Sequence, residues 1–163
     1  MKFFLIALLA IFLTSCASTP EPLYGSPQFN WPVRKGRITQ GFKRGSRKHQ
    51  GLDISGTRNT PIYSAAQGRV LYAGQGFSGY GKLIIIEHDG DRWASFYAHL
   101  NDFKVHEGSF VKKGQLIGLM GRTGRATGVH LHFEIRYNLR PVDPRPYMAR
   151  QTASLEKDSS PSQ

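Results

Sequence analysis

Six histidines give this 163-residue chain its clearest candidates for catalytic or metal-binding side chains. Two of them, His130 and His132, lie in a segment where apolar and polar residues alternate, which is typical of a β-strand. Alternate residues of a strand share one face, so both imidazoles project to the same side from backbone positions roughly 6.6 Å apart. Such a pair can bind a metal ion such as zinc, and a solvated polar face would have the same pattern.

A second candidate pair is His49 and Asp53, four residues apart in the sequence HQGLD. On an α-helix this spacing would place both side chains on one face, but Gly51 and the surrounding β-like sequence argue against a helix. On a straight strand the two residues would lie about 13 Å apart, too far to bind one ion. We therefore expect a bend near Gly51, with His49 in a loop and Asp53 entering a strand.

Short apolar runs separated by glycines must position these side chains. No stretch of twelve residues keeps the apolar period of a helix, so the sequence predicts little helix. The expected fold is all-β, an open β-barrel or sandwich of short antiparallel strands. The expected strands cover residues 62–65, 69–73, 83–88, 93–99, 116–120 and 131–136.

The sequence GQGFSG at 74–79 matches the glycine spacing of dinucleotide-binding loops. Those loops bind pyrophosphate at the N-terminus of a helix that follows them. Here the segment that follows contains three consecutive isoleucines, 84–86, and predicts a strand. We interpret the glycines as part of a hairpin loop.

Four segments together resemble the lysostaphin/LytM-type peptidoglycan metallopeptidases. They are HQGLD at 49–53, YAHL at 97–100, GRTGRATG at 121–128 and HLHFE at 130–134. The resemblance extends over about residues 31–147. It implies an all-β domain with a zinc site in a surface groove, and peptidoglycan as the substrate.

The resemblance also implies a role for individual residues. By it, the zinc ligands are His49, Asp53 and His132, and three protein ligands with one position for water are typical of catalytic zinc. His130 would act as the general base, and His99 would stabilise the oxyanion.

Three other residues and one segment have no direct catalytic assignment. His88 and His106 match no catalytic position of the family, and Glu134 belongs to the motif without being a ligand. The resemblance implies that Glu134 supports the site from behind or from its rim. Residues 121–128 either shape the floor of the cleft or form a plain surface loop.

The first fifteen residues predict an export signal. Lys2 precedes eleven apolar residues, 3–13, which are too few to span a bilayer and typical of a signal peptide. The sequence LTSC, which ends at Cys16, resembles the lipobox of bacterial lipoproteins, in which the cysteine is lipidated; an ordinary cleavage site is the alternative. Cys16 is the only cysteine. Ala17 follows it, where Asp would suggest retention in the inner membrane of a two-membrane bacterium, so the resemblance implies the outer membrane, facing the periplasm.

We therefore divide the chain into four segments. Residues 1–15 are the lipoprotein signal peptide, and 16–30 a lipidated tether rich in Pro, Ser and Thr. Residues 31–147 are the LytM-type peptidase domain, and 148–163 a disordered tail.

The chain is strongly basic, with 22 Lys and Arg against 11 Asp and Glu. This balance favours anionic partners. Outside the cytoplasm we expect peptidoglycan stem peptides and cross-links, and the membrane through the lipid anchor, rather than nucleic acid; we expect a monomer. No acidic residue occurs between Val33 and Leu52, where basic residues are dense. This stretch either attracts an anionic polymer or only adds solubilising charge.

Together these features predict a zinc-dependent endopeptidase that hydrolyses peptide cross-links of peptidoglycan. The alternative is a non-catalytic LytM-type activator of cell-wall amidases. The complete set of ligands and catalytic histidines favours the enzyme. The motifs do not identify the bond cleaved, and the two-membrane interpretation alone favours cross-linked D-Ala over a glycine bridge.

Overall fold

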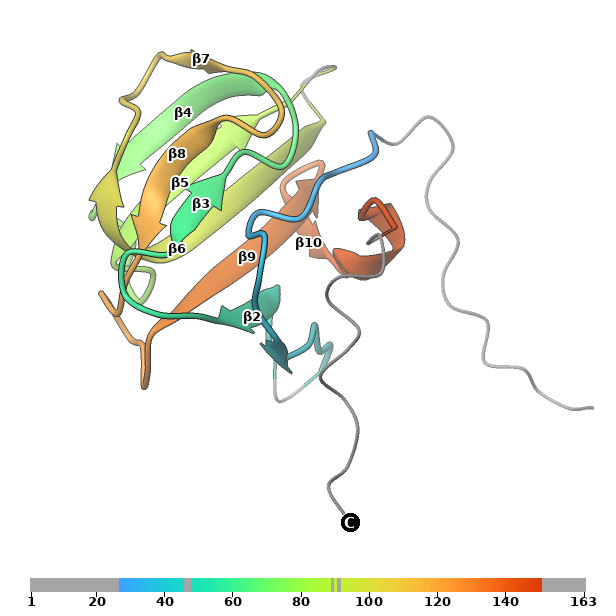
Figure 1. Cartoon of the computed structure of the whole chain (residues 1–163). Coiled ribbons are helices and arrows are strands. Elements are labelled where there is room, and N and C mark those ends of the chain that lie inside the picture. The colour runs from blue at the N-terminus through green and yellow to red at the C-terminus, as the bar shows by residue number, and fades with distance from the viewer. Residues whose placement is uncertain (1–26, 46–47, 89, 91, 151–163) are drawn as a thin grey trace, which may run out of the picture.

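The computed structural model describes residues 27–45, 48–88, 90 and 92–150 (Figure 1). Within these ranges the chain forms ten strands and one short 3-10 helix, and the named strands pair in antiparallel fashion. The predicted all-β fold is confirmed. The expected signal peptide, Cys16 and most of the expected tether and tail lie outside the described residues. In the described part, no helix is long and apolar enough to cross a membrane.

The ten strands and the 3-10 helix follow one another along the chain with short connections. They are β1 (Ile38–Gln40), β2 (Leu52–Ser55), β3 (Pro61–Tyr63), β4 (Gly68–Gly74), β5 (Lys82–Glu87), β6 (Trp93–Phe103), β7 (Phe110–Val111), β8 (Leu116–Met120), β9 (His130–Tyr137), β10 (Arg140–Val142) and η1 (Arg145–Tyr147). The six expected strands correspond to β3, β4, β5, β6, β8 and β9.

Strand β9 lies between β2 and β6 in a sheet of order β1-β2-β9-β6-β5-β4-β7. Strand β8 pairs with both β3 and β6, and the sheet curves around the core (Figure 1). The register sets Asp53 of β2 directly opposite His132 of β9, and Ala98 of β6 opposite His132 on the other side. Because directly opposed residues share a face, this register alone brings Asp53 beside His132.

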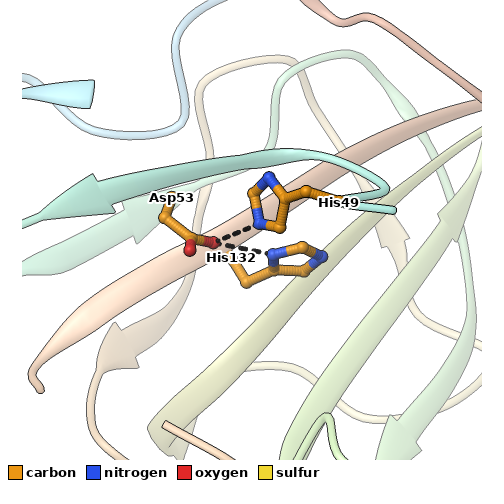
Figure 2. A group of neighbouring side chains, drawn as sticks. All are labelled: His49, Asp53 and His132. Atoms are coloured by element: carbon orange, nitrogen blue, oxygen red, sulfur yellow. Dashed lines mark hydrogen bonds and ion pairs between the residues drawn. The ribbon is translucent and has the colours of Figure 1, made fainter. Parts of the chain in front are cut away.

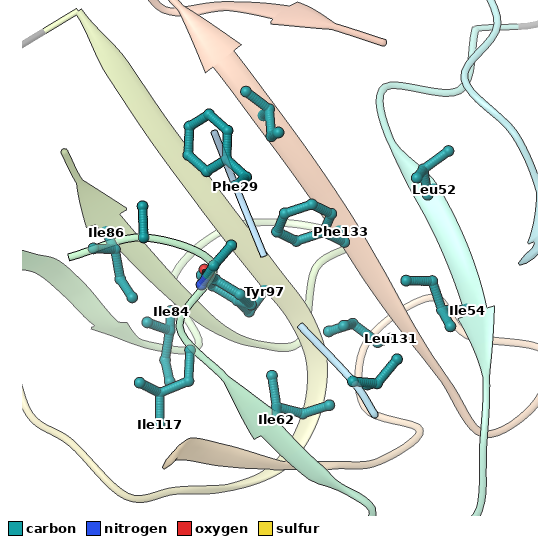
Figure 3. Packing of buried hydrophobic residues seen from close by; sticks show 14 of the residues in the cluster. Phe29, Leu52, Ile54, Ile62, Ile84, Ile86, Tyr97, Ile117, Leu131 and Phe133 are labelled. Carbon is teal, nitrogen blue, oxygen red and sulfur yellow. Dashed lines mark hydrogen bonds between the residues drawn. The ribbon is translucent and has the colours of Figure 1, made fainter. Parts of the chain in front are cut away.

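The main core lies on the other face of β9. Leu131, Phe133 and Ile135 alternate into it and are fully buried. Phe133 packs against Tyr97, with ring centroids 5.4 Å apart, and β2 adds further apolar side chains (Figure 3). Burial of an aromatic side chain of this kind contributes about 1.5–3 kcal/mol. His130, His132 and Glu134 take the alternate positions, as the sequence pattern predicts.

The ends of the described chain meet at the edge of this core. Phe29 is fully buried and packs on Trp93, and its backbone pairs with Met148. The backbone N–H of Phe29 donates to Tyr147 over 2.9 Å. The folded body therefore extends beyond the expected limits of 31 and 147 to include Phe29 and Met148.

Candidate metal centre

One carboxylate oxygen of Asp53 is the point on which the predicted ligands converge (Figure 2). Oδ1 of Asp53 lies 3.0 Å from Nε2 of His49 and 2.8 Å from Nδ1 of His132. The ligand atoms of the three residues all lie within 4.8 Å of one another. The structure thus brings together the three side chains that the resemblance names as ligands.

This donor set fits a zinc ion. Two imidazole nitrogens and one carboxylate oxygen are ordinary zinc ligands, and donors around one tetrahedral zinc lie roughly 3.3 Å apart. The observed separations of 2.8 and 3.0 Å need only a small outward shift to reach that spacing. His49 would bind the zinc ion through Nε2, and His132 would bind it through Nδ1.

The absence of a side chain at Gly51 lets the chain pass close to β9 between His49 and Asp53. A Cβ atom on Gly51 would lie 2.2 Å from the carbonyl oxygen of Phe133, so the chain approaches β9 too closely for any side chain. His49 precedes β2 and its backbone pairs with Lys43. The structure therefore has His49 outside the strand and Asp53 within β2, the arrangement predicted from the sequence.

Three histidines of the site share one hydrogen-bond pattern at Nδ1. Each Nδ1 lies close to a backbone carbonyl oxygen, which can only accept, so Nδ1 carries the hydrogen. Nε2 of each ring is then left toward the site. The pairs are His49 with Gly41 at 2.9 Å, His99 with Thr123 at 2.8 Å and His130 with Gly128 at 3.0 Å.

His132 differs because a carboxylate faces each of its nitrogens. Nδ1 faces Asp53, and Nε2 lies 3.0 Å from Oε1 of Glu134. Burial alone would lower the pKa of His132, but the hydrogen bonds to Asp53 and Glu134 outweigh it and raise the pKa to about 9. For Asp53, burial would raise the pKa, but the hydrogen bond from His132 and the nearby histidine charges leave it below its usual value.

His99 leaves the alternation of β6 to join the site. Its φ of +61° is a left-handed conformation, between the core residues Tyr97 and Leu100. Non-glycine residues in this conformation occur preferentially at functional sites. The ring of His99 lies 4.7 Å from that of His130, centroid to centroid, and 5.9 Å from that of His132.

Burial lowers the pKa of His99 to about 4, although its hydrogen bond to Thr123 acts in the opposite direction. The neutral ring carries its hydrogen at Nδ1, so Nε2 offers a lone pair. A role in stabilising an oxyanion would require a proton at Nε2. In both His99 and His130 the hydrogen at Nδ1 leaves the lone pair of Nε2 toward the site.

A surface cleft of about 320 Å³ contains the five predicted site residues. The expected groove is therefore present around His49, Asp53 and His132. The described residues that line it are Gln40, His49, Asp53, Ser78, Gly79, Tyr80, His99, Arg125, Thr127, His130 and His132. Segment 121–128 was expected either to shape the cleft or to form a plain surface loop. It contributes Arg125 and Thr127 to the cleft lining.

Tyr80 is a cleft residue that the sequence did not single out as a site residue. Its hydroxyl donates to Oε1 of Glu134 over 2.7 Å, and Arg136 donates to the same hydroxyl over 3.0 Å. Glu134 is fully buried and also accepts from Nε of Arg136. The expected supporting position of Glu134 thus corresponds to a buried network behind His132.

The remaining two histidines lie outside this cleft. His88 is buried beside Phe29, and its ring nitrogens contact the carbonyl of Gln67 and the hydroxyl of Ser95. His106 is exposed and contacts the backbone of Glu107. Neither is among the lining residues, in agreement with the lack of a catalytic assignment for them.

The pattern of peptidase family M23 matches residues 47–144 of this chain, which include every residue of the cluster. The chain belongs to peptidase family M23. The predicted likeness to lysostaphin and LytM-type peptidases is confirmed by this match and by solved structures. This chain is 37% identical to a zinc containing peptidase from Vibrio cholerae, with a TM-score of 0.66, and the match covers 72% of this chain and 39% of that one. The catalytic domain of lysostaphin from Staphylococcus simulans is 30% identical, with a TM-score of 0.61, covering 69% and 89%.

Curated relatives of this M23 chain include lipoproteins. This chain is 44% identical over 129 residues to outer membrane antigenic lipoprotein B of Haemophilus influenzae, and the match covers 79% of this chain and 31% of the relative. It is 41% identical over 123 residues to the murein hydrolase activator NlpD of Escherichia coli, covering 76% and 32%. This chain therefore spans about a third of the length of each of these two relatives.

Proposed function

We propose that this M23 chain is a zinc-dependent endopeptidase that hydrolyses peptide cross-links of bacterial peptidoglycan. The observation that carries the proposal is the convergence of His49 and His132 on Asp53, in a cleft that His99 and His130 also line. This is a three-ligand set with two further bases beside it, which suits hydrolysis rather than a structural metal. The similarity to a zinc containing peptidase supports the same function.

His49, Asp53 and His132 would hold the zinc ion. When bound, zinc would polarise the scissile carbonyl and lower the pKa of a water molecule. His130 would accept a proton from the attacking water at Nε2, because Nδ1 donates to Gly128. His99 would stabilise the developing negative charge once Nε2 carries a proton.

A second candidate function is activation of other murein hydrolases without catalysis. The curated relatives favour this function over catalysis, because NlpD of Escherichia coli is named a murein hydrolase activator. The two candidates share the fold and the peptidoglycan context. They differ in whether this chain's own cleft performs a reaction, and the geometry of the cleft supports the first candidate best.

The proposed location is the outer membrane, with the domain facing the periplasm and anchored through lipidated Cys16. The name of outer membrane antigenic lipoprotein B of Haemophilus influenzae supports it. Peptidoglycan would be the partner within reach of such an anchored domain, and we propose that the chain acts as a monomer.

One experiment separates the two functions. Purified cross-linked peptidoglycan fragments are incubated with the zinc-loaded chain, with and without a chelator, and the products are identified by mass spectrometry. A parallel reaction contains an amidase. Cross-link cleavage that the chelator and His132→Ala abolish would support the endopeptidase. Stimulation of the amidase by His132→Ala as well as by wild type, without chelator and with no cleavage by the chain itself, would overturn it in favour of the activator.

A further inference from the structure

Arg125 is the only lysine or arginine among the described residues that line the cleft. The other charged lining group, apart from the histidines, is the carboxylate of Asp53, which points to His49 and His132. The guanidinium of Arg125 lies on an exposed residue, in reach of a ligand that enters from solvent. A cleft with a single arginine at its rim offers one defined position for an anionic group.

The backbone of Arg125 is held in place by two glycine-containing turns. Its N–H donates to the carbonyl of Gly79 over 2.9 Å. Gly81 and Gly124 have φ of +65° and +69°, and a Cβ on Gly124 would lie 2.3 Å from the nitrogen of Gly81. The two turns therefore touch backbone to backbone, which only glycine permits at both positions.

Thr123 ties the same turn to the site. Its carbonyl accepts the hydrogen bond from Nδ1 of His99, and its hydroxyl donates to Leu100 and accepts from the N–H of Lys82. The segment that orients His99 thus also carries Arg125, two residues later. The backbone from which the guanidinium of Arg125 extends is therefore fixed relative to His99, which lines the same cleft as the candidate ligands.

We propose that Arg125 binds a free carboxylate of the substrate next to the scissile bond, which makes the cleft selective for D-Ala cross-links to a diamino dicarboxylic acid. In such a cross-link the second carboxyl group of the diamino acid remains free on the carbon that bears the scissile nitrogen, whereas a cross-link through the side-chain amine of lysine has no carboxylate there. A bond within a glycine bridge has no carboxylate there. Arginine suits this task because its planar guanidinium binds a carboxylate through two parallel hydrogen bonds.

This inference rests on the proposed peptidoglycan substrate and specifies which class of cross-link it is. The general positive charge of the chain would give a weaker and less local preference for anions. Arg122 offers a matched control, because it belongs to the same segment, is exposed, and is not among the residues that line the cleft. Its Nε lies 3.4 Å from the carbonyl of Ala126.

The test compares two synthetic probes. In the acid probe, D-Ala is joined to a diamino acid with a free carboxylate beside the scissile nitrogen. In the amide probe, that carboxylate is a primary amide. The preference is the ratio of kcat/KM for the two probes or, if the zinc-loaded chain cleaves neither, the ratio of their dissociation constants from calorimetry. Wild type, Arg125→Gln and Arg122→Gln are measured side by side.

We expect wild type to prefer the acid probe by on the order of tenfold, the value of a charge-assisted hydrogen bond. Arg125→Gln should reduce the preference to less than about twofold, and Arg122→Gln should keep it. A preference that survives in Arg125→Gln, that Arg122→Gln removes equally, or that wild type lacks, would overturn the inference. A preference in binding that depends on Arg125, without cleavage, would uphold it while the proposed endopeptidase fails. Cleavage of both probes without any preference would uphold the proposed endopeptidase and overturn the role of Arg125.

Discussion

Nε2 of His132 donates a hydrogen bond to Oε1 of Glu134 over 3.0 Å, and both residues project from the same face of β9. Glu134 is in turn held by Tyr80 and Arg136. Burial would raise the pKa of Glu134, but these hydrogen bonds outweigh it and lower the pKa, so the carboxylate stays ionised. An ionised partner at Nε2 orients the ring so that Nδ1 faces Asp53, and it increases the basicity of Nδ1.

Replacing Glu134 should therefore weaken metal binding without removing a ligand. We expect Glu134→Ala to bind zinc about 10–100-fold more weakly, the usual effect of losing the partner of a ligating histidine. Glu134→Gln should recover part of the affinity, because the amide oxygen can still accept from Nε2. Competition with a fluorescent zinc chelator measures this, with the exposed His106→Ala as the control. Equal affinity in Glu134→Ala and wild type would refute the role of Glu134.

Gly51 should be needed for both folding and metal binding. A Cβ at Gly51 would overlap the backbone of Phe133, so Gly51→Ala must displace the start of β2 from β9 and move Asp53 with it. We expect a loss of about 1–3 kcal/mol in the free energy of unfolding, with reduced zinc retention. Denaturant unfolding and metal analysis measure the two effects. Gly41→Ala, at a position with open space around it, should lose much less unfolding free energy.

The sequence predicts those parts of the site that depend on local pattern. The alternation of residues 130–136 predicts the face shared by His130 and His132, and Gly51 predicts the bend before Asp53. These predictions are correct because strand periodicity and the absence of a side chain at a glycine both act over only a few residues. The short apolar runs predict the central strands for the same reason.

The features that sequence reasoning missed depend on contacts between distant segments. Tyr80 meets Glu134 across 54 positions, and no spacing rule links them. All three residues of β1 are exposed and β7 has only two residues, so neither strand has an apolar run that could indicate it. The left-handed turn at His99 is likewise set by its neighbours in space, since histidine has only a modest preference for it.

Acid should destabilise the metal-free protein partly through His99. Burial lowers the pKa of His99 to about 4 from an ordinary 6.5. The unfolded chain takes up this proton as the pH falls through 6.5, and the folded chain does not until about 4. Stability is therefore lost as the pH falls through this window, by up to about 1.4 kcal/mol per pH unit. Unfolding at pH 7 and pH 5 should show a smaller loss in His99→Asn, which tolerates the positive φ; equal losses would contradict the assignment.

Removal of Cys16 should release the protein from the membrane. The apolar segment 3–13 is too short to span a bilayer, so the proposed lipid chains are the anchor. We expect Cys16→Ala to move to the soluble periplasmic fraction, whereas Ser18→Ala stays with the outer membrane. Fractionation followed by immunoblotting measures this. Retention of Cys16→Ala in the outer membrane would rule out the lipid anchor.

The two histidines that share a face of β9 should respond differently to substitution. Nδ1 of His132 lies 2.8 Å from the carboxylate oxygen of Asp53, whereas Nε2 of His130 lies 3.7 Å from the same oxygen. Loss of a ligand removes metal affinity, while loss of a base leaves the three-ligand set complete. We expect His132→Ala to purify with little zinc and no activity. His130→Ala should keep close to one zinc per chain and lose about 10²–10⁴-fold in turnover. Metal analysis and cross-link cleavage on the same preparations measure both; zinc lost from His130→Ala and kept by His132→Ala would reverse the two roles.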